Sequence, residues 1–345
     1  MPVITASALT EFSQNLLVAG GFAADDARQM ARLLIWANLR GTDSHGVLRI
    51  PRYIEMLGQG SVSTGGAPEV VSAFGAVTVI DGGRCPGAVG MGLAVEKAAA
   101  LASRLGVGIC AARAISHAGA VGFFAESLAR QGQVGIVMTA SKPLMSYFGA
   151  RGEALSTNPI AISAPVPGAD PVTLDMSTAA VALGKVLAAR DTGRALEPGW
   201  AIDETGAETT DANRVAALLP MAGAKGSGLS LMIEVLASVL AGNAVIAPVL
   251  LGRKKGGFNG LVIALDPAAF GPRDRFDTDM AELADAIHAL VPAEGTPSVL
   301  LPGERGAATA RKRLESGIPL AVGTARRLAE AAAELNVAMP PELAV

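Results

Sequence analysis

Two histidines in similar short motifs are the residues of this sequence best suited to chemistry. His45 lies in the run DSHG, and His117 lies in the run SHAGA. In each motif a serine precedes the histidine and a small residue follows it, so the ring can face a cleft without crowding. Because an imidazole gives or takes a proton near neutral pH, both histidines are candidates for general acid–base catalysis.

An arginine four residues after the first histidine could hold an anionic substrate. The guanidinium of Arg49 is planar and can bind a carboxylate through two parallel hydrogen bonds. Tyr53 would share a helical face with His45 and Arg49 if this segment is helical. Arg52 is expected on a solvated face. A proton donor beside a carboxylate-binding arginine suits chemistry at the carbon atom next to that carboxylate.

A metal site is the second interpretation of the same region. Asp43, His45 and His117 could ligate zinc, although no HExxH motif or cysteine pair accompanies them. Asp43 is as easily explained as a charge at a helix end, so we expect no metal. The remaining histidine, His288, lies near the end of a helical pattern and is expected at the surface.

Glycine-rich segments with polar residues are candidates for holding a phosphate-bearing cofactor. The sequence has neither GxGxxG nor GxxxxGK[ST], so neither a Rossmann turn nor a P-loop is predicted. The run from Gly223 to Gly228 contains Lys225 and opens a predicted helix, and amide groups at a helix start can bind an anion. A glycine-rich loop with a solvated lysine explains the run equally well.

The elements that must position these residues are mixed helices and strands. Apolar spacing predicts helices near the N-terminus and over residues 24–39, 87–105, 119–131, 177–190, 228–241, 277–290, 303–316 and 323–335. Short apolar runs predict strands over residues 77–81, 107–111, 135–140, 160–164, 172–174 and 261–266. The mixture indicates an α/β or mixed α+β fold. The second helix should end near Gly41, which places His45 just past a helix end.

The composition is that of a globular chain with a large core. The 345 residues suffice for two domains, 50% are apolar and 17% are charged. A net charge of −3 without a basic block argues against nucleic acid or an anionic membrane as a partner. Two cysteines, Cys85 and Cys110, are too few for a disulfide framework and favour a reducing compartment.

One uncharged run is long enough to cross a bilayer. It extends from Val235 to Gly252, but it contains Gly242, Asn243 and Pro248, which favour a buried helix followed by a loop. The N-terminus lacks a basic region and predicts an amphipathic helix in place of a signal peptide. We therefore expect a cytoplasmic protein that does not enter a membrane.

Six motifs together resemble a known family. They are RGTDSHGVLRIPRY, SHAGAVGFF, STNPIAISAP, LDMSTAAVALGKV, GWAIDETGAETTD and AGAKGSGLSLMIEVLASVLAG. In this order and spacing, from about residue 5 to residue 335, the chain resembles the malate/L-lactate dehydrogenase family of the second type. That group includes ureidoglycolate, sulfolactate and malate dehydrogenases, diketogulonate reductase and the cyclic ketimine reductases.

The resemblance implies a fold, an assembly and a reaction. The fold would be the family's NAD(P)-dependent ketoreductase type, which is not Rossmann. Residues 1–118 and 306–345 would form a substrate and dimerisation domain, with an NAD(P)-binding domain of residues 119–305 inserted between them. By the same resemblance, the protein would be a homodimer. The reaction would transfer a hydride between NAD(P)H and C2 of a 2-oxo or 2-imino acid.

The resemblance also implies roles for individual residues. His45 and His117 would line the nicotinamide end, with His45 preferred as the proton donor. Arg49 would hold the substrate carboxylate, near Ser44 and Tyr53. The residues expected at the cofactor are Ser141, Lys142, Thr157, Asn158, Asp175, Met176, Ser177, Lys225, Gly226, Gly303, Glu304 and Arg305.

Lys142 favours NADP(H) over NAD(H). It follows a predicted strand and Ser141, where an adenosine ribose could lie. An acidic residue there would bind the ribose 2′-hydroxyl, whereas a lysine attracts a 2′-phosphate. Arg151 is a second candidate cation for that phosphate. NAD(H) stays open as the cofactor.

The substrate is the least determined property. Ketimine reductases carry a second histidine where this chain has Ala118, so SHAGA is closer to the ureidoglycolate and hydroxy-acid branch. The loop from Gly242 to Asn259 is shorter than usual in the family, which leaves the substrate open. The first hypothesis is a 2-oxo or 2-hydroxy acid oxidoreductase, and the second is a cyclic ketimine reductase. From different classes, a metal-dependent hydrolase and an inactive binding protein are the third and fourth hypotheses.

Overall fold

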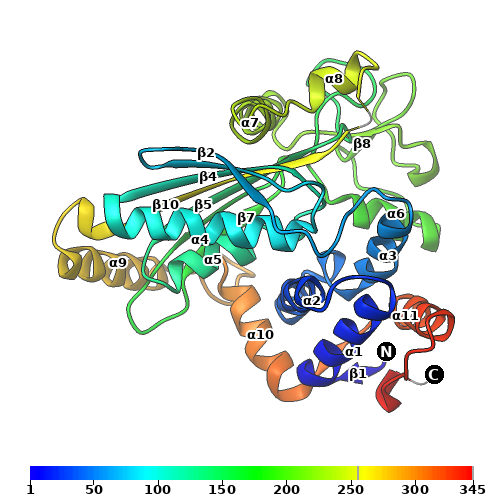
Figure 1. Cartoon of the computed structure of the whole chain (residues 1–345), viewed down its shortest axis with the longest axis horizontal. Coiled ribbons are helices and arrows are strands. Elements are labelled where there is room, and N and C mark those ends of the chain that lie inside the picture. The colour runs from blue at the N-terminus through cyan, green and yellow to red at the C-terminus, as the bar shows by residue number, and fades with distance from the viewer. Residues whose placement is uncertain (255, 344–345) are drawn as a thin grey trace.

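The protein is a mixed α/β structure with a central sheet and a separate group of helices (Figure 1). A computed structural model describes residues 1–254 and 256–343. In Figure 1 the helical group lies at the lower right, and the sheet extends away from it to the left. The predicted mixed fold class is therefore confirmed.

The helical group is built from both ends of the chain. Its members are β1 (Val3–Ile4), α1 (Ala6–Ala19), α2 (Ala24–Leu39), α3 (Ile50–Gly58), α10 (Glu304–Ser316), β11 (Ile318–Pro319) and α11 (Val322–Glu334). The hydroxyl of Thr5 accepts a hydrogen bond from the amide of Ala8 and caps α1. β1 and β11 pair antiparallel and join the two ends of the chain. Leucines and other apolar side chains of α1, α2 and α11 are buried between these helices.

The central sheet has seven strands. In spatial order they are β2 (Glu69–Phe74), β3 (Val77–Asp81), β4 (Val107–Ile115), β10 (Phe258–Leu265), β5 (Val134–Ser141), β6 (Ile160–Ala164) and β7 (Val172–Met176). Only β3 and β4 pair parallel, and α4 (Gly87–Leu105) connects them. The other neighbours pair antiparallel. Thus β10, from late in the chain, lies between β4 and β5.

Helices cover both faces of this sheet. α4 and α5 (Gly122–Ala129) pack on one face, where they share the main apolar core with the sheet and the helical group. α4 approaches β4 so closely that a Cβ at Gly108 would overlap the carbonyl oxygen of Ala98. α7 (Ala224–Glu234) continues into a π-helical turn (Val235–Val239) over the other face. A smaller core surrounds Met145 and Leu218.

The remaining helices and strands lie between residues 183 and 288. They are α6 (Leu183–Thr192), β8 (Ala201–Ile202), β9 (Ala217–Leu218), α8 (Ile246–Leu250) and α9 (Arg273–His288). 3-10 turns lie at Ala212–Arg214, Pro267–Ala269 and Pro341–Leu343. Across residues 1–254 and 256–343, no helix is both long enough and apolar enough to span a bilayer.

Most predicted elements are confirmed, with three corrections. The helix predicted over residues 177–190 begins only at Leu183, because Thr178 donates its amide to Thr157 and Ala179 pairs with Pro220. The helix predicted over 228–241 begins earlier, at Ala224, and becomes π-helical after Glu234. The strand β2 was not predicted, because all six of its residues are exposed and show no alternation.

Among the other predicted ranges, 24–39, 77–81, 87–105 and 160–164 match the observed elements, and the rest differ at their ends. The helix predicted over 119–131 is confined to residues 122–129, and the strand predicted over 107–111 continues to Ile115. The sheet takes β2, β3 and β4 from residues 1–118 and its remaining strands from residues 119–305. The division into two domains at those positions stays a prediction.

Candidate active site

The segment with His45 and Arg49 is a pair of tight turns between α2 and α3. Asp43–His45 and Val47–Arg49 form two 3-10 turns. The side chain of Asn38 holds both, because its Oδ1 accepts from the amide of Val47 at 2.8 Å and its Nδ2 donates to Asp43 at 2.7 Å. A Cβ at residue 46 would overlap the Asn38 amide, so Gly46 is required between the turns.

The charges around this segment have structural roles. Arg313 of α10 donates through Nη1 to Asp43 Oδ1 at 2.9 Å and also to the backbone carbonyl of Asn38. Asp43 therefore fastens the turns to the C-terminal part of the helical group. Arg52 pairs with Glu55 at 2.6 Å on the outer side of α3, and both side chains are exposed. The expectation that Arg52 lies on a solvated face is confirmed.

The two histidine rings face each other. Their centroids are 5.7 Å apart and their planes differ by 23°, which is a stacked arrangement. Ser44 Oγ lies 3.0 Å from His45 Nδ1, and Tyr53 OH lies 2.7 Å from His117 Nδ1. The fold thus joins two motifs that are 72 residues apart in the sequence.

His117 is held in the loop between β4 and α5. The Oγ atom of Ser116 accepts from the amide of Gly87 at 3.0 Å, at the start of α4. A Cβ at Gly87 would overlap the carbonyl oxygen of His117, so the helix can lie against the loop only with glycine there. On another side, Phe258 packs edge-on against the His117 ring, with centroids 5.7 Å apart.

Burial and Arg49 keep both imidazoles neutral. Burial, and then the positive charge of Arg49, lowers the pKa of His45 to about 4. Burial also lowers the pKa of His117 well below its usual value, with further contributions from His45 and Arg49. Burial raises the pKa of Tyr53 to about 12, so its phenol keeps its proton.

Arg49 is oriented by a single backbone contact. Its Nε donates to the carbonyl of Ser44 at 2.8 Å. Within the described ranges, its terminal nitrogens Nη1 and Nη2 have no hydrogen-bond partner. The guanidinium is therefore positioned by one nitrogen, and two donors remain for an anion.

Most of the predicted cofactor residues meet at one edge of the sheet. Ser141 ends β5 and Lys142 follows it, Thr157 and Asn158 precede β6, and Asp175, Met176 and Ser177 end or follow β7. Ser141 Oγ lies 2.6 Å from Ser156 Oγ, and Asn158 Nδ2 donates to the carbonyl of Ser230 in α7 at 2.9 Å. Because β5, β6 and β7 alternate in direction, these positions lie at the same edge of the sheet, which we call the cofactor edge.

The start of α7 completes that edge. Thr178 accepts the amide of Met221, and Met221 accepts the amide of Gly226. Lys225 is exposed in the first turn of the helix. The hydroxyl oxygen of Thr178 is buried and has no partner in the part of the chain that the structure describes. Hydroxyls, a lysine and helix-start amides suit the phosphates and ribose of a dinucleotide, so these residues fit a nicotinamide cofactor.

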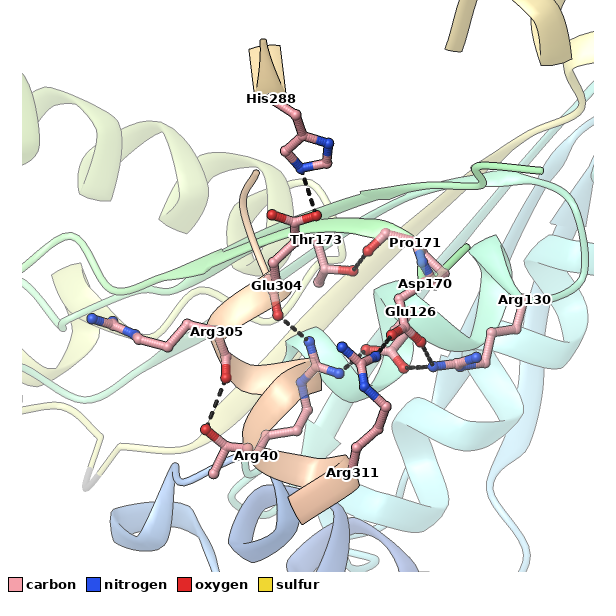
Figure 2. Close-up of polar contacts among 12 residues, drawn as sticks. Arg40, Glu126, Arg130, Asp170, Pro171, Thr173, His288, Glu304, Arg305 and Arg311 are labelled. Carbon is pink, nitrogen blue, oxygen red and sulfur yellow. Dashed lines mark hydrogen bonds and ion pairs between the residues drawn. The ribbon is translucent and has the colours of Figure 1, made fainter. Parts of the chain in front are cut away.

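The segment Gly303–Arg305 lies beside β7 at the start of α10 (Figure 2). Thr173 of β7 donates its amide to Pro302, and a Cβ at Gly303 would lie 2.9 Å from the Thr173 carbonyl. Glu304 is engaged by the protein itself, because Oε1 contacts His288 Nε2 at 2.8 Å and Oε2 accepts from the amide of Leu301 at 2.8 Å. Arg305 is exposed, and His288 lies at the surface as expected.

Asp175 connects the cofactor edge to the loop with His117. Its Oδ2 accepts from the amide of Gly122, the first residue of α5, at 3.0 Å. Burial raises the pKa of this carboxyl to about 6, whereas the Gly122 amide and the charge of Arg40 lower it. α5 begins five residues after His117, so the two parts of the site share one short segment.

Two neighbours of the site were not predicted. Phe258 touches the His117 ring, and the start of α6 lies beside Ser44, where a Cβ at Gly184 would be 3.4 Å from the Ser44 Cβ. Phe258 lies in the segment of residues 242–259 and Gly184 lies in the motif LDMSTAAVALGKV, but the sequence predicts no contact of either residue with the histidine motifs. Among the described residues, no group of three or more His, Cys, Asp or Glu side chains is arranged to hold a metal ion.

Comparisons with known proteins place the chain among enzymes. The profile of the family described as malate/L-lactate dehydrogenase matches residues 4–329. The ureidoglycolate dehydrogenase (NAD(+)) of Escherichia coli (strain K12) is 31% identical over 324 residues, which cover 92% of each chain. The malate/(S)-sulfolactate dehydrogenase of Methanothermus fervidus is 34% identical over 336 residues, covering 94% of this chain and 95% of that relative. The crystal structure of delta1-piperideine-2-carboxylate reductase from Pseudomonas syringae pvar. tomato has 30% identity and a TM-score of 0.85, covering 96% of this chain and 100% of that one.

Proposed function

Because the chain belongs to the malate/L-lactate dehydrogenase family, we propose that it interconverts a small 2-oxo acid and its 2-hydroxy acid by hydride transfer with NAD(P)H. The observation that supports this proposal most is the cluster of His45, His117 and Arg49. It combines neutral imidazoles with a guanidinium whose terminal nitrogens are free in the described structure.

Arg49 would bind the carboxylate of the substrate. Its Nε contact to Ser44 fixes the guanidinium plane, so Nη1 and Nη2 can form two parallel hydrogen bonds to an anion. Such a contact orients the neighbouring C2 atom relative to both histidines. Orientation of this kind lowers the barrier because the reacting groups no longer have to find each other by diffusion.

The histidines would handle the proton. In the oxidation direction, a neutral imidazole can accept the proton of the hydroxyl group as the hydride leaves C2. In the reduction direction, the same ring must return a proton to the oxygen. A bound carboxylate would offset the charge of Arg49 and raise the pKa of His45 and His117, which favours protonation once substrate is present. His45 is the preferred donor.

Tyr53 would act on His117 more than on the substrate. Its hydroxyl lies 2.7 Å from His117 Nδ1, and its raised pKa keeps it protonated. A phenol that donates to Nδ1 fixes the proton of neutral His117 on Nε2. Tyr53, which the sequence predicts as a substrate contact, is therefore proposed as a positioning residue for His117.

A nicotinamide dinucleotide supplies or accepts the hydride when bound. Lys225 and the first turn of α7 would hold phosphate, while the hydroxyls and amides at the ends of β5 and β7 would hold ribose and nicotinamide. The exposed Lys142 beside Ser141 supports NADP(H). The E. coli relative is named for NAD(+), which keeps NAD(H) as the second candidate cofactor.

A cyclic ketimine reductase is the second candidate function. The structural similarity to the piperideine-2-carboxylate reductase supports it, and an imino acid presents the same carboxylate to Arg49. Ala118, in place of a second histidine, favours the hydroxy-acid reaction. A metal-dependent hydrolase is disfavoured, because Asp43 is already bound by Asn38 and Arg313.

We also propose the domain division, a homodimer and a cytoplasmic location. The helical group contains residues from both ends of the chain, in agreement with a substrate domain of residues 1–118 and 306–345. Met232, Val239 and Leu240 form an exposed apolar stripe on α7 and its π-helical turn, which would suit a second copy. The buried free thiols of Cys85 and Cys110 suit a reducing compartment.

A reductase screen tests the proposed function. Oxidation of NADPH and of NADH is followed by the loss of their absorbance, with small 2-oxo acids and cyclic imines as substrates. Turnover of 2-oxo acids is the expected result. Turnover of piperideine-2-carboxylate alone would favour the second candidate, and no oxidation of either cofactor with any of them would contradict the proposal.

A further inference from the structure

Arg40 joins segments that belong to the two parts of the proposed site. It caps the C-terminal end of α2, five residues before His45. Its Nη1 lies 3.0 Å from Glu126 Oε2 in α5, and its Nη2 donates to the carbonyl of Gly303 at 3.0 Å (Figure 2). The Arg40 guanidinium, at the end of α2, therefore contacts both α5, which covers the sheet, and the segment at the start of α10.

The ion pair of Arg40 and Glu126 is shielded from water. Their side chains are 10% and 4% exposed, whereas those of Arg52 and Glu55 are 55% and 52% exposed. An exposed pair contributes little to stability, but removal of one partner of a buried pair leaves an uncompensated charge. Because Arg40 is buried, water cannot readily take over its contacts to Glu126 and Gly303.

Glu126 extends the connection towards β7. Its Oε1 accepts from Arg130 Nε at 2.9 Å and from Arg130 Nη2 at 2.6 Å. Arg130 also contacts Asp170, in the turn before β7, and Arg311 of α10 contacts the same carboxylate. In Figure 2 these side chains form a chain of polar contacts between α5, the turn and α10. These ion pairs connect Arg40 through Glu126 and Arg130 to the turn before β7 and to α10.

We propose that Arg40 is a positioning residue that fixes the turns with His45 and Arg49 relative to the segment of residues 301–305. The inference rests on the proposed function, since it assigns one segment to substrate and the other to cofactor. Hydride transfer needs C2 of the substrate close to the nicotinamide, and a displacement of about 1 Å can reduce a rate by about 100-fold. Only a forked side chain reaches both Glu126 and Gly303, so lysine is an incomplete substitute.

The test compares Arg40→Met, Arg40→Lys and the double variant Arg40→Met/Glu126→Gln with Arg52→Met as the matched control. For each full-length protein we would measure kcat, KM for substrate and cofactor, the melting temperature, and hydrogen exchange of residues 41–49 and 301–305. In Arg40→Met we expect kcat/KM to fall by about 10- to 100-fold. We also expect faster exchange in both segments. The kcat/KM and exchange rates of Arg40→Lys should lie between those of Arg40→Met and the wild type. Those of Arg52→Met should match the wild type.

The double variant separates positioning from stability. In Arg40→Met the Oε2 atom of Glu126 loses its partner, while Oε1 keeps Arg130. The Glu126→Gln change removes that buried negative charge, so the melting temperature should partly recover while kcat/KM stays low and exchange stays fast. Recovery of kcat/KM in the double variant would overturn the proposal and leave Arg40 a role in stability alone. If the wild type reduces none of the substrates, the proposed function fails by itself. Hydrogen exchange still tests the positioning role of Arg40 in that case. Unchanged exchange of residues 41–49 or of residues 301–305 in Arg40→Met overturns it.

Discussion

The histidine cluster and the cofactor edge are built in different ways. His45, His117 and Tyr53 are enclosed, each is fixed by a near neighbour, and burial shifts the pKa of every one. At the cofactor edge, Lys142 and Lys225 are exposed on helix and strand ends. The comparison indicates that the first region is prepared for proton transfer and the second for binding. Substitutions in the histidine cluster should therefore reduce kcat. Substitutions at the cofactor edge should alter the KM for the cofactor and the preference between NADPH and NADH.

The largest effect is expected from the loss of Arg49. Arg49→Met removes the two free guanidinium donors, and kcat/KM for the 2-oxo acid should fall by about 1000-fold, because binding and orientation are lost together. The cofactor dissociation constant should stay near the wild-type value. Steady-state kinetics and cofactor titration would check this, with Arg52→Met as the control. If Arg49→Met lost cofactor affinity as strongly as substrate turnover, the histidine cluster and the cofactor edge would not have separate roles.

A smaller effect is expected from Tyr53→Phe. The change removes the hydroxyl beside His117 Nδ1 but keeps the buried ring, so kcat should fall by about 10- to 100-fold through a misoriented imidazole. KM for the cofactor should not move. The decisive comparison is kcat against substrate KM in the two proteins. A raised substrate KM with unchanged kcat would return Tyr53 to the role of a substrate contact.

The smallest effect on rate is expected at Lys142. Lys142→Asp should lower the ratio of kcat/KM for NADPH to that for NADH by about tenfold or more, because a carboxylate repels a 2′-phosphate. The maximal rate with saturating cofactor should change little, since the histidine cluster is untouched. Steady-state kinetics of the wild type and the variant with NADPH and with NADH would measure this ratio. A wild-type preference for NADH, or a variant with an unchanged ratio, would remove Lys142 from cofactor choice.

The sequence predicts local features of the site and misses the contacts between distant segments. Gly41 correctly indicates that His45 follows the end of α2. The strands β3 and β6 are predicted at their observed bounds because their apolar runs are short and sharply ended. The spacing of Tyr53 predicts a helical face shared with His45 and Arg49. The structure instead has 3-10 turns at His45 and Arg49, and Tyr53 contacts His117.

Contacts across the fold have no signal in a single sequence. Asp43 resembled a solvated helix-end charge, and only the structure brings Arg313, 270 residues away, against it. Arg40 is the first residue of the motif RGTDSHGVLRIPRY, but the sequence predicts no role for it, because Glu126 and Gly303 are near it only after the sheet and α10 have packed. The sequence likewise gives no sign that the Glu304 carboxylate contacts His288 and the amide of Leu301, and its contact with the cofactor stays a prediction.

The pH dependence of 2-hydroxy acid oxidation tests the acid–base assignment most directly. kcat/KM would be measured from acid to neutral pH for the wild type, His45→Ala and His117→Ala. Because the pKa of His45 is lowered to about 4, the neutral base is lost only as pH falls through that value. Wild-type kcat/KM should therefore stay level near neutrality and decline in acid, and each variant should lose about 100-fold or more. Wild-type turnover in both variants would contradict the account.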